Sequence, residues 1–169
     1  QKDLDDMEAM VSSTLDFMRG TETREPSQAL DLMALLESIQ ENVLEAGGKV
    51  KLSGQLAEPY TGKHLALKRC LMNLVENAVR YGKEANISVT QSDDEIMISI
   101  SDKGPGIPEK SLQKVFDPFF RLESSRAQQT GGTGLGLGIA RNIARAHGGD
   151  LILQNSLNGG LTAQLTLPV

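Results

Sequence analysis

The sequence has few aromatic residues, a single cysteine and no long apolar run. Aromatic side chains make up 4% of the 169 residues and tryptophan is absent, so the core must be aliphatic. The lone Cys70 lies in an apolar helical run, which favours packing and excludes an internal disulfide or a multi-thiolate metal site. No apolar stretch approaches the ~20 residues of a membrane span. No signal peptide heads the chain.

Two kinds of partner are disfavoured by the charge. The formal net charge is −5, which argues against nucleic acid or an anionic membrane as the main partner. The length suits one domain, and a hydrophobic content of 39% is sufficient for a core. An anion site in this chain must therefore be local, built from backbone amides and a few arginines.

A glycine-rich stretch runs directly into an amphipathic helix. Glycines stand at positions 131, 132, 134, 136 and 138, and apolar residues follow at helical spacing from Leu135. Such a junction offers unpaired N–H groups and a positive dipole end to a phosphate, although a plain flexible loop is the alternative. The two best-known glycine signatures are absent. We expect this helix to end at His147, a cation in its last turn, followed by glycine as the C-cap.

The opening segment predicts a helix that packs against another helix. Apolar residues recur at intervals of three and four along Lys2–Arg19, in a narrow stripe formed by Leu4, Met7, Val11, Leu15 and Met18. Gly20 is expected to end this helix, and residues 21–28 have the composition of a linker. We therefore predict a boundary near residue 22, which separates residues 1–22 from residues 23–169.

The next part of the chain predicts two helices joined by a strand and a turn. Helical spacing covers residues 29–46, alternation favours a strand over residues 49–56, and residues 59–62 are expected to turn the chain. A long helix over residues 63–81 follows. It carries Asn73 and Asn77 beside its buried stripe, with Arg80 and Tyr81 at the end of the same face. Asparagine is a poor helix former, so this pair indicates a polar patch at the edge of the core, unless both side chains are simply solvated.

Two runs of alternating apolar and polar residues then predict a β-hairpin, and a candidate ligand-binding residue follows at the end of its second strand. They cover residues 85–91 and 95–102, with a polar turn between them. Asp102 ends the second strand, and Gly104 and Gly106 follow. This places a fixed carboxylate beside backbone that can approach a ligand, although a β-turn capped by the aspartate is the simpler alternative.

The remaining segments predict a short helix, a lid and a closing hairpin. Residues 109–115 read as a short helix that leads to a phenylalanine-rich stretch at 116–121. Residues 122–130 are polar without periodicity and have the composition of a mobile lid, with Arg121 and Arg126 available to a phosphate. Strands at 150–155 and 161–167 close the chain.

In this order the motifs resemble the ATP-binding catalytic domain of sensor histidine kinases of two-component systems. That superfamily also includes gyrase, chaperone and mismatch-repair ATPases. The resemblance covers roughly residues 30–169. Its four motifs are Asn73-Leu-Val-Glu-Asn77-Ala-Val-Arg-Tyr-Gly82, Asp102-Lys-Gly-Pro-Gly-Ile107, Phe116-Asp-Pro-Phe-Phe120 and Gly132-Thr-Gly-Leu-Gly-Leu137.

The fold that the resemblance implies is an α/β two-layer sandwich of the Bergerat type. Its mixed, mostly antiparallel sheet would be covered on one face by the helices beginning near residues 30, 63 and 134. A partial dimerisation helix would precede it.

The resemblance also implies roles for the motif residues. Asp102 would accept from the adenine amino group, and Asn73 and Asn77 would hold Mg²⁺, an ion that prefers oxygen ligands. Arg80 and the amides of residues 132–137 would hold the phosphates. The implied ATP site comprises Asn73, Asn77, Arg80, Tyr81, Asp102, Gly104, Gly106, Ile107, Phe119, Arg121, Gly132, Thr133, Gly134, Leu135, Gly136, Leu137 and Thr162, with Asn73, Asn77 and Arg80 also taken as catalytic.

The residue four positions before Asn77 separates two chemistries. Gyrase-like members have a glutamate there that activates water, whereas this chain has Asn73. Glu76 lies about 100° around the helix and is expected to be solvated. Phosphoryl transfer to a protein side chain is therefore favoured over hydrolysis. The alternatives are a gyrase-like hydrolase, a degenerate ATP-binding regulatory module and an anti-sigma serine kinase.

The phosphate acceptor of that family is not recognisable here. Neither His64 nor His147 stands in a His-Glu/Asp-x-x-Thr-Pro setting, and residues 1–22 look like the second helix of a dimerisation hairpin cut off after its acceptor helix. The implied partners are the protein's own dimerisation domain, a response regulator and, in the full-length protein, a second copy, with no nucleic acid. The implied location is the cytoplasmic part of an inner-membrane-anchored bacterial sensor.

Overall fold

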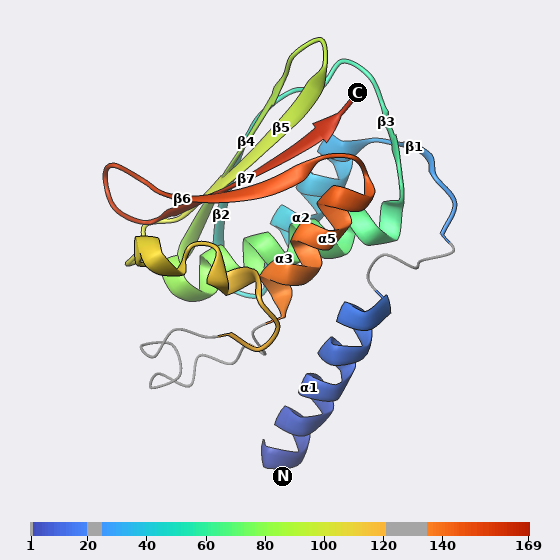
Figure 1. Cartoon of the computed structure of the whole chain (residues 1–169). Helices are drawn as coiled ribbons and strands as arrows, with labels where there is room; N and C mark the ends of the chain where they lie inside the picture. The colour runs from blue at the N-terminus through green and yellow to red at the C-terminus, as the bar shows by residue number, and fades with distance from the viewer. Residues whose placement is uncertain (1, 20–24, 121–134) are drawn as a thin grey trace.

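A five-stranded sheet covered on one face by three helices forms the body of the protein (Figure 1). The computed structural model describes residues 2–19, 25–120 and 135–169. The predicted two-layer α/β sandwich is confirmed, and so is its mixed, mostly antiparallel sheet. The layers meet in one aliphatic core, as the low aromatic content requires.

The sheet has the strand order β2-β4-β5-β7-β6. Its strands are β2 (Lys49–Gly54), β4 (Glu84–Gln91), β5 (Glu95–Ser101), β6 (Asp150–Asn155) and β7 (Leu161–Pro168). β2 pairs with β4 in parallel, whereas every other neighbouring pair in this sheet is antiparallel. Val89, Ile98 and Leu165 are paired across three strands and are all buried. Alternation thus turns one apolar face toward the helices.

Three helices cover that face. They are α2 (Leu32–Glu45), α3 (His64–Gly82) and α5 (Gly136–Ala146), and α3 and α5 lie side by side beneath the sheet (Figure 1). Cys70 of α3 is fully buried, its thiol donates to the carbonyl oxygen of Ala140 at 3.4 Å, and burial raises its pKa to about 12. The cysteine is therefore an inert packing residue, as its position in an apolar run predicts.

Two short strands occupy residues for which the sequence pattern predicts the start of a helix and a turn. β1 (Gln28–Leu30) pairs antiparallel with β3 (Tyr60–Gly62), so the prediction that residues 59–62 only turn the chain is wrong, and the helix predicted from residue 29 begins after β1. Residues 28–30 and 60–62 are too short to show periodicity. Their pairing depends on tertiary contacts, including the burial of Tyr60 at 7% exposure.

The predicted short helix over residues 109–115 is also corrected. The structure has two separate 3-10 turns there, η1 (Glu109–Ser111) and η2 (Lys114–Phe116). Pro108 caps the first turn, and each turn spans three residues, too few for regular α-helical bonding.

His147 ends α5, as the sequence predicts, where it is the C-cap residue, and Arg145 is a basic residue of the last turn. The Nδ1 of His147 lies 2.8 Å from the carbonyl oxygen of Ile143, and its Nε2 accepts a hydrogen bond from the backbone N–H of Lys63 at 3.1 Å. His147 thus joins the end of α5 to the start of α3.

The opening helix α1 (Lys2–Arg19) has the predicted bounds. Leu4, Met7, Val11 and Leu15 are 44–64% exposed, so this apolar stripe is uncovered. Within the described residues, no helix has the length and apolar character needed to cross a membrane. The boundary near residue 22 stays a prediction, because residues 20–24 lie outside the described part.

A glutamate distant in sequence caps helix α3. The N-cap residue Lys63 makes no side-chain capping bond. Instead Glu25 accepts from the backbone N–H of Leu65 (2.6 Å to Oε2) and of Ala66 (3.1 Å to Oε1). A carboxylate at this end satisfies two otherwise unpaired donors and complements the helix dipole. It also fastens the start of the sandwich domain to the helix that carries Asn73 and Asn77.

We therefore expect Glu25→Ala to lower the free energy of unfolding by about 1 kcal/mol, because two backbone donors lose their acceptor. Glu25→Gln should lie between Ala and wild type, since an amide keeps one acceptor oxygen. Urea denaturation followed by circular dichroism measures both. Glu58→Ala, at an exposed position, is the control. Equal stabilities of the Glu25→Ala and Glu58→Ala proteins would contradict the capping role.

Candidate nucleotide-binding site

Asp102 lies at the point where β5 ends, and it is 8% exposed. Its Oδ1 accepts from the backbone N–H of Gly104 at 2.8 Å and of Leu161 at 3.2 Å. Its own N–H donates to the carbonyl oxygen of Leu161 at 3.0 Å. The carboxylate is therefore held by two segments distant in sequence, one of which begins β7.

The second oxygen of this carboxylate can accept a hydrogen bond from a ligand. Both backbone bonds go to Oδ1, and no donor from residues 25–120 or 135–169 is recorded on Oδ2. Burial raises the pKa of Asp102, while the hydrogen bonds from Gly104 and Leu161 oppose the rise. A desolvated carboxylate with one committed oxygen is suited to accept from an amino group through the other.

Two glycines that sequence reasoning did not single out make room for Asp102. A Cβ at Gly82 would overlap the Asp102 side chain, and a Cβ at Gly160 would overlap the Asp102 carbonyl oxygen. Gly160 also has φ +92°, a conformation that side chains disfavour. The Gly159-Gly160 pair was readable as a turn, but its closeness to Asp102 depends on the fold.

Asn155 fixes the loop that follows Asp102. Its Oδ1 accepts from the backbone N–H of Ile107 at 2.9 Å, and its Nδ2 donates to the carbonyl oxygen of Ile107 at 2.6 Å. The sequence analysis missed this residue, whose only signal was an amide at the end of a strand. Gly104, Gly106 and Ile107 are thereby held against the end of β6.

Thr162 lies close to the same place. It pairs with Ser101, the residue before Asp102, and its hydroxyl lies 2.8 Å from that of Ser156. The structure therefore brings Thr162 to the Asp102 side of the site. Tyr81 lies here too, because its carbonyl oxygen would meet a Cβ at Gly104 at 2.6 Å.

A second group of polar residues lies where α3 meets α5. Asn73 and Asn77 are one turn apart on α3 and are both partly buried, whereas Glu76 and Arg80 are exposed. Asn73 donates through Nδ2 to the carbonyl oxygen of Gly136 at 3.3 Å. The side chain of Asn73 thus fixes the N-terminus of α5 against α3.

These amides fit a magnesium ion. The Oδ1 of Asn73 is not used in its bond to Gly136, and no hydrogen bond from another described residue is recorded on the Asn77 side chain. Carboxamide oxygens are hard ligands, and Mg²⁺ typically takes one or two protein ligands together with waters and phosphate oxygens. Asn73 and Asn77 would therefore hold such an ion beside the start of α5.

The N-terminus of α5 offers backbone donors. Leu135 is its N-cap and is buried, and its side chain makes no capping hydrogen bond. The first N–H groups, at Gly136 and Leu137, lie in the predicted phosphate-binding motif. Arg121, Gly132, Thr133 and Gly134 lie outside the described residues, as does the predicted lid with Arg126, so their roles stay predictions.

The phenylalanine motif divides into a buried and an exposed part. Phe116 is 8% exposed and the Arg141 guanidinium lies 4.4 Å from its ring centroid. Phe119, the residue predicted to belong to the site, is 44% exposed and has φ +65°. Its predicted role stays a prediction. The stacking of Arg141 on Phe116 was not predicted from the sequence.

The chain is similar in sequence to a known family and to curated proteins. Residues 62–169 match the family model described as histidine kinase-, DNA gyrase B-, and HSP90-like ATPase. Among curated proteins, the sensor histidine kinase GtrS of Pseudomonas aeruginosa is 47% identical over 99% of this chain and 34% of its own length. The signal transduction histidine-protein kinase BaeS of Escherichia coli is 35% identical over 83% of this chain and 32% of its own length.

Solved structures have the same fold. Full-length ShkA in complex with AMPPNP superposes with a TM-score of 0.79 at 22% identity, over 95% of this chain and 35% of that one. The ATP-binding domain of PrrB from Mycobacterium tuberculosis gives a TM-score of 0.70 at 27% identity, over 85% of this chain and 98% of that one.

The raised pKa of Asp102 predicts a pH dependence of stability. Between the unfolded pKa of about 3.9 and the higher folded pKa, the folded state binds more protons than the unfolded state. The wild type should therefore lose stability relative to Asp102→Asn as pH rises through this window, since the amide oxygen can still accept from Gly104 and Leu161.

Urea denaturation at intervals between pH 4 and pH 7 measures this difference. The loss should level off once the folded-state carboxyl has ionised. A stability difference between the two proteins that is constant over this range would contradict the raised pKa.

Proposed function

This chain belongs to the histidine kinase-, DNA gyrase B-, and HSP90-like ATPase family, and we propose that it binds MgATP and donates the γ-phosphate to a histidine. Within that family it is a catalytic ATP-binding domain of the sensor histidine kinase type. The chain spans about a third of the length of GtrS and BaeS. The acceptor histidine would stand on the dimerisation domain of the whole protein, and an aspartate of a response regulator would receive the phosphoryl group next.

The observation that carries the choice of transfer over hydrolysis is the side chain at position 73. Asn73 lies one turn before Asn77 and is committed through its amide to Gly136. An amide cannot take a proton from water as a carboxylate does. Glu76, the nearest carboxylate in sequence, is exposed on another face of α3. The site therefore lacks, among its described residues on α3, a group placed to activate water.

The roles that we propose follow the two groups of residues. Asp102 accepts from the adenine amino group through Oδ2, with Gly104, Ile107 and Thr162 around the base. Asn73 and Asn77 hold Mg²⁺, which would neutralise phosphate charge, while Arg80 and the amides at the start of α5 orient the phosphates. Catalysis in this scheme rests on positioning and charge neutralisation.

We further propose that residues 1–22 belong to a dimerisation hairpin. The uncovered stripe of Leu4, Met7, Val11 and Leu15 is the width of a helix–helix seam, which supports this assignment. In the whole protein the stripe would face its companion helix and a second copy. The catalytic domain would then work on the cytoplasmic side of a membrane-anchored sensor.

The direct test is calorimetric titration of MgATP into this chain and into Asp102→Asn, with Asp93→Asn, at an exposed hairpin position, as the control. We expect Asp102→Asn to bind at least about tenfold more weakly, because a charged hydrogen bond is lost. The same samples are assayed for phosphate release and for phosphorylation of an added dimerisation domain that carries the acceptor histidine.

Binding, negligible phosphate release and transfer to the added histidine are the expected results. Rapid phosphate release without transfer would contradict the argument from Asn73 and indicate a hydrolase. Binding without either reaction would instead indicate a regulatory ATP-binding module.

A further inference from the structure

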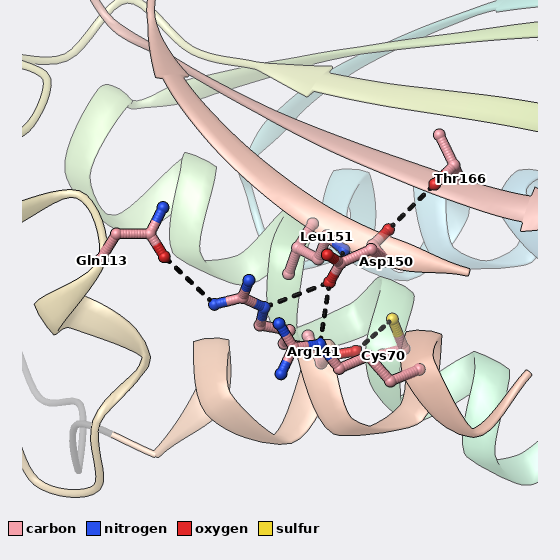
Figure 2. Close-up of polar contacts among 8 residues, drawn as sticks. Cys70, Gln113, Arg141, Asp150, Leu151 and Thr166 are labelled. Carbon is pink, nitrogen blue, oxygen red and sulfur yellow. Dashed lines mark hydrogen bonds and ion pairs between the residues drawn. The ribbon is translucent and has the colours of Figure 1, made fainter. Parts of the chain in front are cut away.

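Arg141 links helix α5 to the segment that precedes residue 121 (Figure 2). Its Nη1 donates to Oε1 of Gln113 at 3.3 Å. Its guanidinium carbon lies 4.4 Å from the centroid of the Phe116 ring. Its Nε donates to Oδ1 of Asp150 at 3.2 Å. The planar group is thus held by a stacking contact and by bonds in two directions, which a lysine could not reproduce.

Asp150 holds the Arg141 side chain in place through a carboxylate that is itself fixed. The same Oδ1 also accepts from the backbone N–H of Leu151 at 2.8 Å and from Nε of Arg145 at 3.1 Å. Burial raises the pKa of Asp150, but the hydrogen bonds from Leu151 and the two arginines outweigh it and lower the pKa overall. The carboxylate is therefore ionised at neutral pH, and the Arg141 side chain is only 20% exposed.

The two stretches that Arg141 joins stand on either side of residues 121–134 in the sequence. Gln113 and Phe116 precede that segment, and α5 follows it. The N-terminus of α5 is itself bonded to α3 through Asn73 and Gly136. Asn73 therefore fixes the first residue of α5 to α3, and Arg141 fixes the middle of the same helix relative to Gln113 and Phe116.

We propose that Arg141 is a positioning residue of the nucleotide site, which holds the N-terminus of α5 in register with Gln113 and Phe116. This rests on the proposed function, because the backbone donors at the start of α5 are assigned there to the phosphates. Hydrogen-bond donors stabilise phosphate charge only when they are fixed in place beforehand. Loss of Arg141 therefore weakens binding of the phosphates and leaves the adenosine part of the site unchanged.

An open groove on the outer side of α5 gives access to this arginine. It has a volume of about 360 Å³ and is lined by Gln113, Phe116, Asp117, Gly138, Arg141, Asn142 and Arg145. A small guanidinium compound can therefore reach the place that the Arg141 side chain would vacate. This makes chemical rescue of Arg141→Ala possible.

Arg145 supplies a matched control. It lies one turn further along α5, has the same charge and donates to the same oxygen of Asp150. No contact of Arg145 with Phe116 or Gln113 is recorded in the structure. Arg145→Met therefore removes one positive charge and one bond to Asp150 but keeps the link between α5 and the segment before residue 121.

The experiment measures binding of MgATP and of adenosine to the wild type, Arg141→Met and Arg145→Met, with the unfolding midpoint of each protein. We expect Arg141→Met to bind MgATP about tenfold more weakly and adenosine within about twofold of wild type. Arg145→Met should stay within about twofold for both ligands. Millimolar methylguanidinium should restore MgATP affinity to Arg141→Ala and have no effect on Arg141→Met, in which the methionine fills the site.

Three results would overturn the proposal. Equal losses of MgATP affinity in Arg141→Met and Arg145→Met would indicate a general charge effect. Parallel losses for MgATP and adenosine that track the unfolding midpoint would indicate a structural role only. An undiminished effect of Arg141→Met in a Phe116→Leu background would indicate direct contact with phosphate. A wild type that binds no MgATP would instead refute the proposed function.

Discussion

The carboxylate of Asp102 holds together the end of β5, the glycine loop that follows it and the start of β7. Its single oxygen Oδ1 accepts from Gly104 and from Leu161, residues that stand on opposite sides of the helix α5 in the sequence. Burying a carboxylate is costly unless its hydrogen bonds are satisfied, and here backbone amides satisfy one oxygen and leave the other. Positions 82 and 160 require glycine, because a Cβ at either would overlap Asp102. The side of the site that we propose for the base is built around this group.

The side that we propose for the phosphates depends on a different set of contacts, most of which involve helix α5. Asn73 binds its first turn, Arg141 connects it to Phe116 and Gln113, and His147 joins its last residues to the start of α3. Glu25, which lies within the predicted linker, then caps α3. A chain of polar contacts thus runs from the start of the sandwich domain, through α3, to the start of α5. These are the elements that must keep a fixed geometry if backbone amides are to bind phosphates.

The helices and strands with a clear periodicity of apolar residues were predictable from the sequence. The helices that contain Cys70 and Ile143, and the alternating strands through Ile98 and Leu165, follow from apolar spacing alone. The strands at residues 28–30 and 60–62 were not predictable, since three residues show no period and their pairing is decided by tertiary contact. The contact of His147 with the backbone N–H of Lys63 was not predictable for a related reason, since the two residues are 84 positions apart in the sequence.

The residues of the candidate site likewise fall into a predictable group and an unpredictable group. Motif residues such as Asp102, Asn73 and Gly136 could be identified from the sequence, because a polar residue or a glycine beside an apolar run departs from the local pattern and so indicates a functional position. Asn155, Gly82 and Arg141 gave no such signal, because each acts on a partner that only the folded chain brings near: Ile107, Asp102 and Phe116, respectively. Supporting contacts of this kind are visible only in the structure.

We propose that Oδ2 of Asp102 accepts a hydrogen bond from an amino group on the base. Comparing the affinity of the wild-type chain for ATP and for an analogue in which hydrogen replaces the 6-amino group tests this contact. The analogue should bind about 10–100-fold more weakly, the usual effect of losing a hydrogen bond to a charged group. Equal affinities for the two nucleotides would contradict it.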